Sequence, residues 1–246
     1  MPPLSGPDPN DVNQKLLEQY TEIARLAGAL AHEIRNPLST IRLNMELLAE
    51  DLGEGETPGQ RRAMAKVDVV QMECQRLEDL LDDFLNFAKV RQLQLRPVNL
   101  NDVIRRVLDF FLPKAEAAGI DVLDYLAADL PTVQLDREAF HAALLNLVLN
   151  AEQAMPDGGQ LVIRTFETAD GVALRLIDTG CGMDEETRSR IFKAFFSTKR
   201  GGSGLGLPSA RKIIEAHGGQ IIVQSEVGRG TQFTVKLPTP ARLATD

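Results

Sequence analysis

Two long apolar-periodic runs, separated by a short acidic and glycine-rich break, constrain the fold of this chain more than any other feature. Apolar side chains recur at spacings of three and four residues between Leu16 and Leu48, and again between Met64 and Ala88. This period places them on one face of a helix. The break over residues 53–59 predicts a turn, so that the two helices form an antiparallel hairpin.

A hairpin of two helices cannot bury both of its apolar faces alone. Two copies can pair into a four-helix bundle, which predicts a homodimer. In the alternative arrangement, the hairpin packs against a later domain of its own chain. We expect the hairpin to span residues 11–92, after a disordered leader over residues 1–10 that is rich in proline.

The pattern changes near residue 93, where a second domain is expected to span residues 93–240, followed by a tail over residues 241–246. Its helices and short strands predict an α+β sandwich with a mostly antiparallel sheet. The predicted fold class is therefore multidomain, an all-α hairpin followed by an α+β sandwich. The expected helices are 98–117, 136–155 and 209–217, and the expected strands are 121–126, 133–135, 160–166, 172–178, 220–225 and 231–237.

Composition excludes several classes of protein. The net charge of −8 argues against a nucleic-acid partner, and no Lys/Arg cluster offsets it. No run of about 18 apolar residues is present, so no membrane segment is expected. The two cysteines, Cys74 and Cys181, lack the spacing of a metal site and indicate a reducing compartment. We expect a cytoplasmic protein or the cytosolic portion of a larger membrane sensor.

The first apolar run contains a chemically unusual segment, Leu30-Ala31-His32-Glu33-Ile34-Arg35-Asn36-Pro37-Leu38. A neutral imidazole, with a pKa of about 6.5, is a competent nucleophile near pH 7. Asn36 follows His32 by one helical turn and projects from the same face. Pro37 leaves the carbonyl of Glu33 without its helical donor, which predicts a bend. Such a segment is expected where a histidine itself receives a phosphoryl group, although a lone histidine is more often a surface or core residue.

Two segments of the second domain indicate a nucleotide. Asn146 and Asn150 lie four residues apart on an apolar helix, and their amides require polar partners, either Mg²⁺ and phosphate or the backbone. Asp178 ends a predicted strand and can accept a hydrogen bond from an exocyclic amine. Gly180 and Gly182 allow the backbone to approach a flat ring, although an ordinary turn explains this segment as well.

A third segment runs from Lys199 to Leu207 and is rich in glycine before a predicted helix. Glycines that lead into a helix N-terminus can cradle an anion through free N–H groups and the helix dipole. The segment is neither a Walker A loop nor a dinucleotide fingerprint, because it lacks the Gly-Lys-Ser/Thr ending and no strand immediately precedes it.

Taken together, these segments resemble the sensor histidine kinases of two-component systems. The His32 segment is similar to their H box. Five further segments, taken as a set, are similar to the N, G1, F and G2 boxes of their Bergerat-fold ATP-binding domain. They are Asn150 within NLVLNA, DTGCGM, Phe192-Lys193-Ala194-Phe195-Phe196, GSGLGL and the closing Gly230-Thr231-Gln232-Phe233. The order and spacing agree from Leu16 to Pro238, and the details are most similar to the nitrogen-regulation-like branch.

The resemblance implies roles for individual residues. His32 would be phosphorylated, Glu33 would act as the general base, and Asn36 would position a water for dephosphorylation of the partner. ATP and Mg²⁺ would be the cofactors. Asn150 would ligate the metal, and the other nucleotide-binding positions would be Asn146, Asp178, Gly180, Gly182, Lys199, Gly202, Gly204, Leu205, Gly206 and Thr231. The segment over residues 183–203 would form a mobile lid over ATP.

The function implied is an ATP-dependent protein histidine kinase that autophosphorylates and passes the phosphoryl group to an aspartate of a response-regulator receiver domain. A response-regulator phosphatase activity is implied as a second capacity. The receiver would dock near Ser39, Leu43 and Glu46. The alternative is a nucleotide-binding scaffold that is non-catalytic or only a phosphatase. Bergerat-fold chaperones, mismatch-repair proteins and topoisomerases are disfavoured because they lack an H box on a dimerising hairpin.

Overall fold

The computed structural model of the chain describes residues 34–50, 52, 57–88, 93–199 and 202–239. The chain divides into two compact units, residues 1–91 and residues 92–246. The predicted leader over residues 1–10, most of the turn over residues 53–59, and the predicted tail over residues 241–246 lie outside the described residues.

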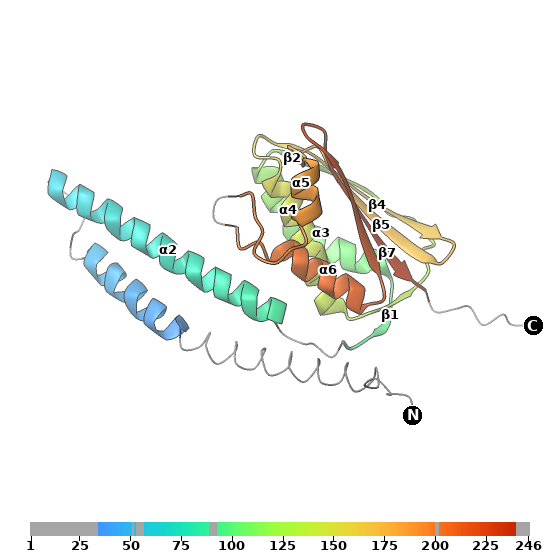
Figure 1. The fold of residues 1–246 in the computed structure, drawn as a ribbon, viewed down its shortest axis with the longest axis horizontal. Coiled ribbons are helices and arrows are strands. Elements are labelled where there is room, and N and C mark those ends of the chain that lie inside the picture. Colours follow the sequence, from blue (N-terminus) through green and yellow to red (C-terminus); the bar gives the residue numbers. More distant parts are fainter. Residues whose placement is uncertain (1–33, 51, 53–56, 89–92, 200–201, 240–246) are drawn as a thin grey trace, which may run out of the picture. The chain divides into compact units, whose positions relative to one another are not determined.

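The first unit contains a helix over residues 34–50 and a 31-residue helix α2, Pro58–Ala88 (Figure 1). Thr57 and Gln60 define the start of α2 by reciprocal hydrogen bonds. The Gln60 N–H donates to Thr57 Oγ1 at 3.2 Å, and the Thr57 N–H donates to Gln60 Oε1 at 3.0 Å. This arrangement is a capping box, and Pro58 follows it at the first helical position, where its missing N–H costs nothing.

Polar contacts link the two helices of the first unit. Arg35 forms an ion pair with Asp82, and Ser39 Oγ donates to Glu78 Oε1 at 3.5 Å. The predicted helical hairpin is therefore confirmed over the described residues. Its buried apolar side chains are Leu38, Val67 and Cys74. Its exposed large apolar side chains are Ile34, Ile41, Leu43, Leu47, Leu48, Val69, Val70, Met72 and Leu77.

The second unit is built on a five-stranded sheet with the strand order β2-β4-β5-β7-β6. The β2–β4 pair is parallel and the other three pairs are antiparallel, which agrees with the mostly antiparallel sheet that was expected. The five strands are β2 Ile120–Tyr125, β4 Gly159–Thr168, β5 Gly171–Asp178, β6 Gln220–Glu226 and β7 Gly230–Pro238. A second, two-stranded sheet pairs β1, Arg96–Val98, with β3, Val133–Leu135.

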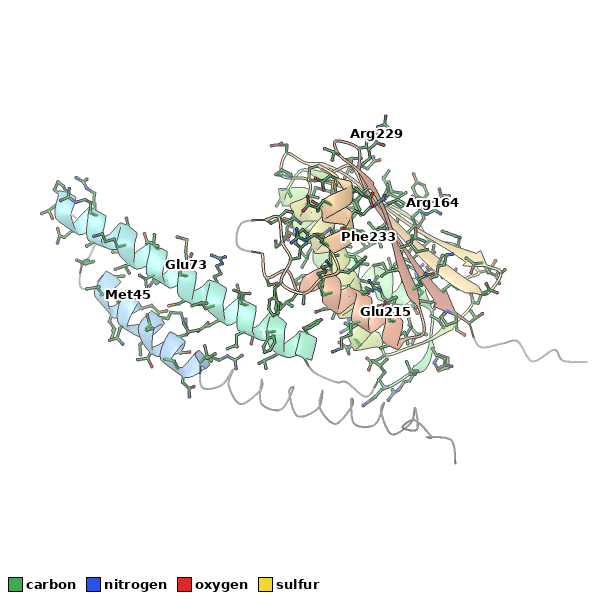
Figure 2. The ribbon with its side chains drawn as sticks, viewed as in Figure 1. Met45, Glu73, Arg164, Glu215, Arg229 and Phe233 are labelled. Atoms are coloured by element: carbon green, nitrogen blue, oxygen red, sulfur yellow. The ribbon has the colours of Figure 1, made fainter. Side chains whose placement is uncertain are left out.

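Three helices cover one face of the five-stranded sheet (Figure 1). They are α3 Leu100–Ala117, α4 Arg137–Gln153 and α6 Gly206–Ala216. The side chains of Phe111 on α3, Phe140 on α4 and Phe233 on β7 are almost completely buried in the core between these layers. Figure 2 shows Phe233 on the helix side of the sheet and Arg164 on the other side. The α+β sandwich predicted from the sequence is thus confirmed.

Two elements, β1 and α5, are absent from the sequence-based expectation because they depend on contacts or caps outside the apolar pattern, and the helix expected over residues 209–217 begins earlier, at Gly206. Residues Arg96–Val98 form β1, and α3 begins only at Leu100, after Asn99 accepts a hydrogen bond from the Asn101 N–H at 2.9 Å. The lid segment contains a short helix α5, Glu185–Arg190, which Asp184 caps by accepting from the Thr187 N–H at 2.8 Å. The acidic residues in the first turn of α5 and the arginines in its last turn are the pattern in the sequence that indicates this helix.

Within the part of the chain that the structure describes, no helix is both long enough and apolar enough to cross a membrane.

Candidate nucleotide site and phospho-acceptor hairpin

Asp178 is the most buried carboxylate of the candidate site. It ends β5 with only 3% of its surface exposed. Its Oδ1 accepts hydrogen bonds from the Gly180 N–H at 2.9 Å and the Thr231 N–H at 3.1 Å, and the described residues place no donor on Oδ2. Burial raises the pKa of Asp178 above its ordinary value, although the two N–H groups and the Lys199 ammonium oppose the shift. One oxygen thus fixes the side chain and the other remains available.

Two glycines after Asp178 are required by close contacts with other parts of the backbone. A Cβ at Gly180 would lie 2.6 Å from the carbonyl oxygen of Ala154, at the end of α4. Gly182 has a φ of +66°, and a Cβ there would lie 2.0 Å from the carbonyl oxygen of Glu226. The Cys181 N–H also donates to the Ala154 carbonyl at 2.9 Å. The turn is therefore held against α4 and β6, a requirement that sequence reasoning had not identified.

The structure brings the lid lysine onto the polar face of α4. Lys199 Nζ donates to Asn150 Oδ1 at 3.1 Å, to the Asn150 carbonyl at 3.3 Å and to Gln153 Oε1 at 3.1 Å. Burial lowers the pKa of Lys199, while the nearby Asp178 and Glu152 carboxylates oppose that shift. Gln153 was missed by the sequence analysis, although its position three residues after Asn150 places it on the same helix face.

The glycine-rich segment leads into α6 beside Asn146. A Cβ at Gly206, the first residue of α6, would lie 3.6 Å from Asn146 Oδ1. Leu205 occupies the N-cap position and makes no side-chain capping bond. The first N–H groups of a helix lack intrahelical partners, so this uncapped end is suited to an anion.

Two further glycines shape the lid before α6. Gly204 has a φ of +66°, and its carbonyl accepts from the Phe195 N–H at 3.1 Å. A Cβ at Gly202 would lie 2.6 Å from Ser197 Oγ. The lid and the end of α4 border an open hollow of about 490 Å³, which Gln153, Lys199 and Gly202 help to line. This volume lies within the range of small-ligand sites.

Aromatic and arginine side chains hold the lid segment in place. The Arg190 guanidinium lies 4.3 Å from the centre of the Phe196 ring, and the Arg211 guanidinium lies 5.3 Å from that of Phe192. Such cation–π contacts link α5 and α6 to the aromatic segment between them.

The predicted phospho-acceptor residues His32 and Glu33 lie outside the described residues, and so does the Glu33 carbonyl on which the predicted bend at Pro37 depends. Asn36 is exposed on the helix over residues 34–50. Among the residues expected to contact a receiver, Ser39 is bonded to Glu78, Leu43 is 55% exposed, and Glu46 pairs with Arg42 at 3.2 Å.

Two family models match successive parts of the chain. Residues 22–93, which include His32, match the His kinase A (phospho-acceptor) domain. Residues 135–241 match the histidine kinase-, DNA gyrase B- and HSP90-like ATPase domain.

Two relatives are similar to most of this chain and are themselves longer proteins. The sensor histidine kinase ZraS of Escherichia coli K12 is 36% identical over 225 residues, which cover 91% of this chain and 47% of ZraS. The signal transduction histidine-protein kinase AtoS of the same organism is 33% identical over 90% of this chain and 36% of AtoS. The chain therefore spans about half the length of ZraS and 36% of the length of AtoS.

Solved structures give the same result. The catalytic domain of the histidine kinase ThkA is 34% identical, with a TM-score of 0.55 over 60% of this chain and 97% of that domain. Full-length ShkA in complex with AMPPNP is 29% identical, with a TM-score of 0.69 over 88% of this chain and 46% of ShkA. Both domains, in this order, together with these likenesses, show that the chain belongs to the sensor histidine kinases of two-component systems.

Proposed function

We propose that this chain is an ATP-dependent protein histidine kinase, in which His32 takes the γ-phosphoryl group of ATP and passes it to an aspartate of a response-regulator receiver domain. The observation that carries the proposal is the buried Asp178 carboxylate, fixed through one oxygen near the Asn150–Lys199 cluster, in a chain that also carries a phospho-acceptor hairpin. The related protein ShkA was solved in complex with AMPPNP, which is an analogue of ATP, and this supports ATP as the nucleotide here.

The adenine end of ATP would be read by Asp178. Its Oδ2 can accept a hydrogen bond from the exocyclic amine, while Oδ1 stays bonded to the Gly180 and Thr231 N–H groups. Thr231 supports this geometry through its backbone, and its Oγ1 lies 2.9 Å from Ser225 Oγ.

The phosphate end would lie between α4, the lid and the start of α6. Asn150 Oδ1 now contacts the Lys199 ammonium, so this oxygen already faces a cation, and amide oxygens are suitable Mg²⁺ ligands. A bound Mg²⁺ would neutralise phosphate charge, which is the main requirement of phosphoryl transfer. Lys199 would exchange its amide partners for phosphate oxygens, Asn146 would adjoin the phosphates, and the glycine segment Gly202, Gly204, Leu205 and Gly206 would cradle them at the uncapped end of α6.

On the hairpin, His32 would act as the nucleophile and Glu33 would fix its tautomer and accept its proton. Asn36, one turn later and exposed, would position a water for dephosphorylation of the receiver. The exposed apolar side chains of both described helices support a homodimer, because a second hairpin would cover them. ThkA has been crystallised with the response regulator TrrA, which supports a receiver as the partner here.

The decisive experiment is incubation of the chain with γ-labelled ATP and Mg²⁺, comparing wild type with His32→Ala and His141→Ala. The chain has three histidines, and His141 is a matched control on α4. We expect acid-labile, alkali-stable label in the wild type and in His141→Ala and no label in His32→Ala.

Transfer of the label to a receiver domain in trans would complete the proposal. ATP binding without any label in the wild type would instead identify a scaffold or a phosphatase. Label that persists in His32→Ala would show that another residue is the nucleophile.

A further inference from the structure

The face of the sheet away from the helices carries two arginines directly opposite each other. Arg164 on β4 and Arg175 on β5 are register partners. The alternation that buries Leu174 and Leu176 against the helices places Arg175 on the other face. Like charges at directly opposite positions destabilise an antiparallel pair. This arrangement therefore costs stability unless an anion accompanies it.

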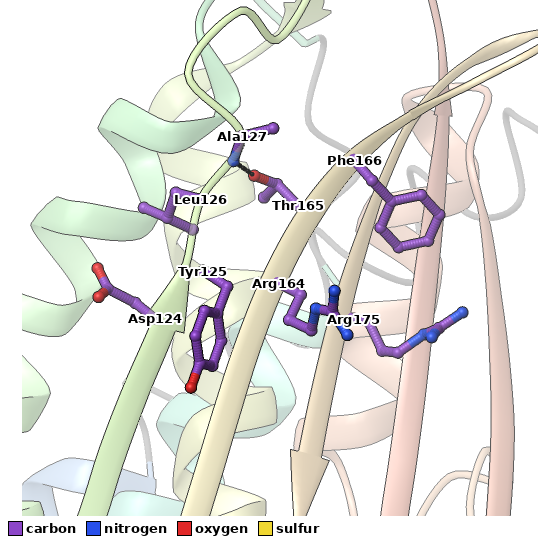
Figure 3. Close-up of a pocket in the computed structure, with 8 residues that line it drawn as sticks. All are labelled: Asp124, Tyr125, Leu126, Ala127, Arg164, Thr165, Phe166 and Arg175. Carbon is purple, nitrogen blue, oxygen red and sulfur yellow. Dashed lines mark hydrogen bonds between the residues drawn. The ribbon is translucent and has the colours of Figure 1, made fainter.

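Each guanidinium is held by an aromatic ring. The Arg164 guanidinium lies 5.9 Å from the centre of the Tyr125 ring, and the Arg175 guanidinium lies 5.1 Å from that of Phe166. Figure 3 shows the two arginine side chains next to each other, with Tyr125 beside Arg164 and Phe166 near Arg175. A guanidinium stacked on a ring keeps the N–H groups at its edge available for hydrogen bonds. The rings thus orient the donors without consuming them.

The described residues do not satisfy these donors. Neither arginine forms an ion pair with any described carboxylate. The Nε of Arg175 is buried and has no hydrogen-bond partner in the described part of the chain. A buried donor left unpaired is destabilising, so a partner of opposite charge would be stabilising here.

The two arginines line an open hollow of about 600 Å³ at the edge of the sheet. It forms because β2 makes its last pair at Tyr125–Arg164, while β4 continues to Thr168. Leu126 and Phe166 supply an apolar wall, and Asp124 is the acidic residue that lines the hollow.

We propose that this hollow binds a phosphate group, either free or as an ester of a small molecule, between the guanidinium groups of Arg164 and Arg175. Arginine forms bidentate hydrogen bonds with phosphate, and a dianion matches two adjacent positive charges. Lys236 on β7 is exposed and pairs with Ala173 on β5. It lies two residues from Thr234, the partner of Arg175, and therefore on the same face of the sheet, where it extends the positive surface. The site is separate from the nucleotide site, because Asp178 lies with Leu174 and Leu176 on the face of β5 toward the helices, whereas Arg175 lies on the opposite face.

The test is a titration of the full chain with sodium phosphate at constant ionic strength, followed by the backbone amide NMR signals of β4 and β5. Arg164→Gln and Arg175→Gln keep much of each aliphatic stem and remove the charge, and each should weaken binding by about tenfold or more. Asp124→Asn removes the opposing charge and should strengthen binding roughly two- to fivefold. Arg106→Gln on α3 is the charge-matched control and should leave the dissociation constant unchanged.

A second arm identifies the source of the phosphate. Phenyl phosphate that binds more tightly than inorganic phosphate would assign the site to phosphate esters, with Phe166 and Leu126 contacting the organic part. Equal affinities would assign it to free phosphate.

Three results would overturn the proposal: signal shifts confined to residues 202–206, an equal loss of affinity in the Arg106→Gln control, or succinate binding as tightly as phosphate. Thermal unfolding of each variant guards against a misfolded protein. A folded Arg175→Gln protein that binds phosphate as the wild type does would also refute the proposal.

Discussion

At the residue scale, Asp178 shows how one side chain can be costly to the fold and useful to the site. Its carboxylate is buried, and burial raises its pKa, so the folded protein carries the charge at a penalty. Two backbone donors on Oδ1 reduce that penalty without removing it. An asparagine could accept the same two hydrogen bonds through its amide oxygen but could not accept a further bond from adenine at its NH₂ group.

We therefore predict that Asp178→Asn weakens ATP binding by more than about tenfold and raises the melting temperature at pH 7.5. Because the folded-state pKa lies above the ordinary 3.8, the folded protein holds this proton more tightly than the unfolded chain, and ionisation costs stability. The gain in melting temperature should disappear as the pH falls below 3.8, where both states are protonated. Calorimetry across this pH range checks the prediction, and a lower melting temperature at pH 7.5 would contradict it.

At the scale of elements, a buried polar network joins the start of α3 to β4 and to the loop after β2. Thr165 Oγ1 donates to Asn101 Oδ1 at 2.9 Å and accepts from the Ala127 N–H at 2.9 Å, while Asn101 Nδ2 donates to the Ala127 carbonyl at 2.8 Å. Asn101 and Thr165 are both buried, so each of these groups depends on the others. The network fixes the loop after Tyr125, which forms part of the rim of the hollow lined by Arg164 and Arg175.

Thr165→Val should lower the free energy of unfolding by about 2 kcal/mol or more, because it leaves Asn101 Oδ1 and the Ala127 N–H unpaired in the core. Thr165→Ser keeps the hydroxyl and should cost only about 1 kcal/mol for the lost methyl group. Urea denaturation of the three proteins measures the difference. Equal losses in the valine and serine variants would show that the network contributes packing and not hydrogen bonding.

At the scale of the whole molecule, the two units differ in how they achieve stability. The second unit has its own continuous core between the helices and the sheet, whereas the first unit leaves many apolar side chains exposed on both described helices. The catalytic domain of ThkA was itself solved as a separate domain. The proposed homodimer accounts for this difference, since only the hairpin then needs a second copy.

A fragment of residues 93–246 should therefore unfold cooperatively, remain monomeric and bind ATP with a dissociation constant close to that of the whole chain. It should take up no label from γ-labelled ATP, since it lacks His32. The whole chain should sediment as a dimer. Analytical ultracentrifugation and calorimetry of both proteins test this prediction, and a dimeric or unfolded fragment would contradict it.

The sequence by itself determined the helical hairpin, the sandwich and the order of the nucleotide motifs. These are local properties, because apolar periods, caps and glycine-rich segments act over a few residues. Strand β3 and the end of β5 at Asp178 were predicted at their observed bounds for this reason.

Only the tertiary structure decided which distant groups meet. Strand β1 exists because Arg96–Val98 pairs with β3, and the Lys199–Asn150–Gln153 contact joins residues almost fifty positions apart. The Arg164–Arg175 pair depends on the register of β4 and β5, because a shift of one residue would place the two side chains on opposite faces of the sheet. The burial that raises the pKa of Asp178 likewise comes from packing around β5. Such distances and environments are set by long-range packing and register, which no local pattern specifies.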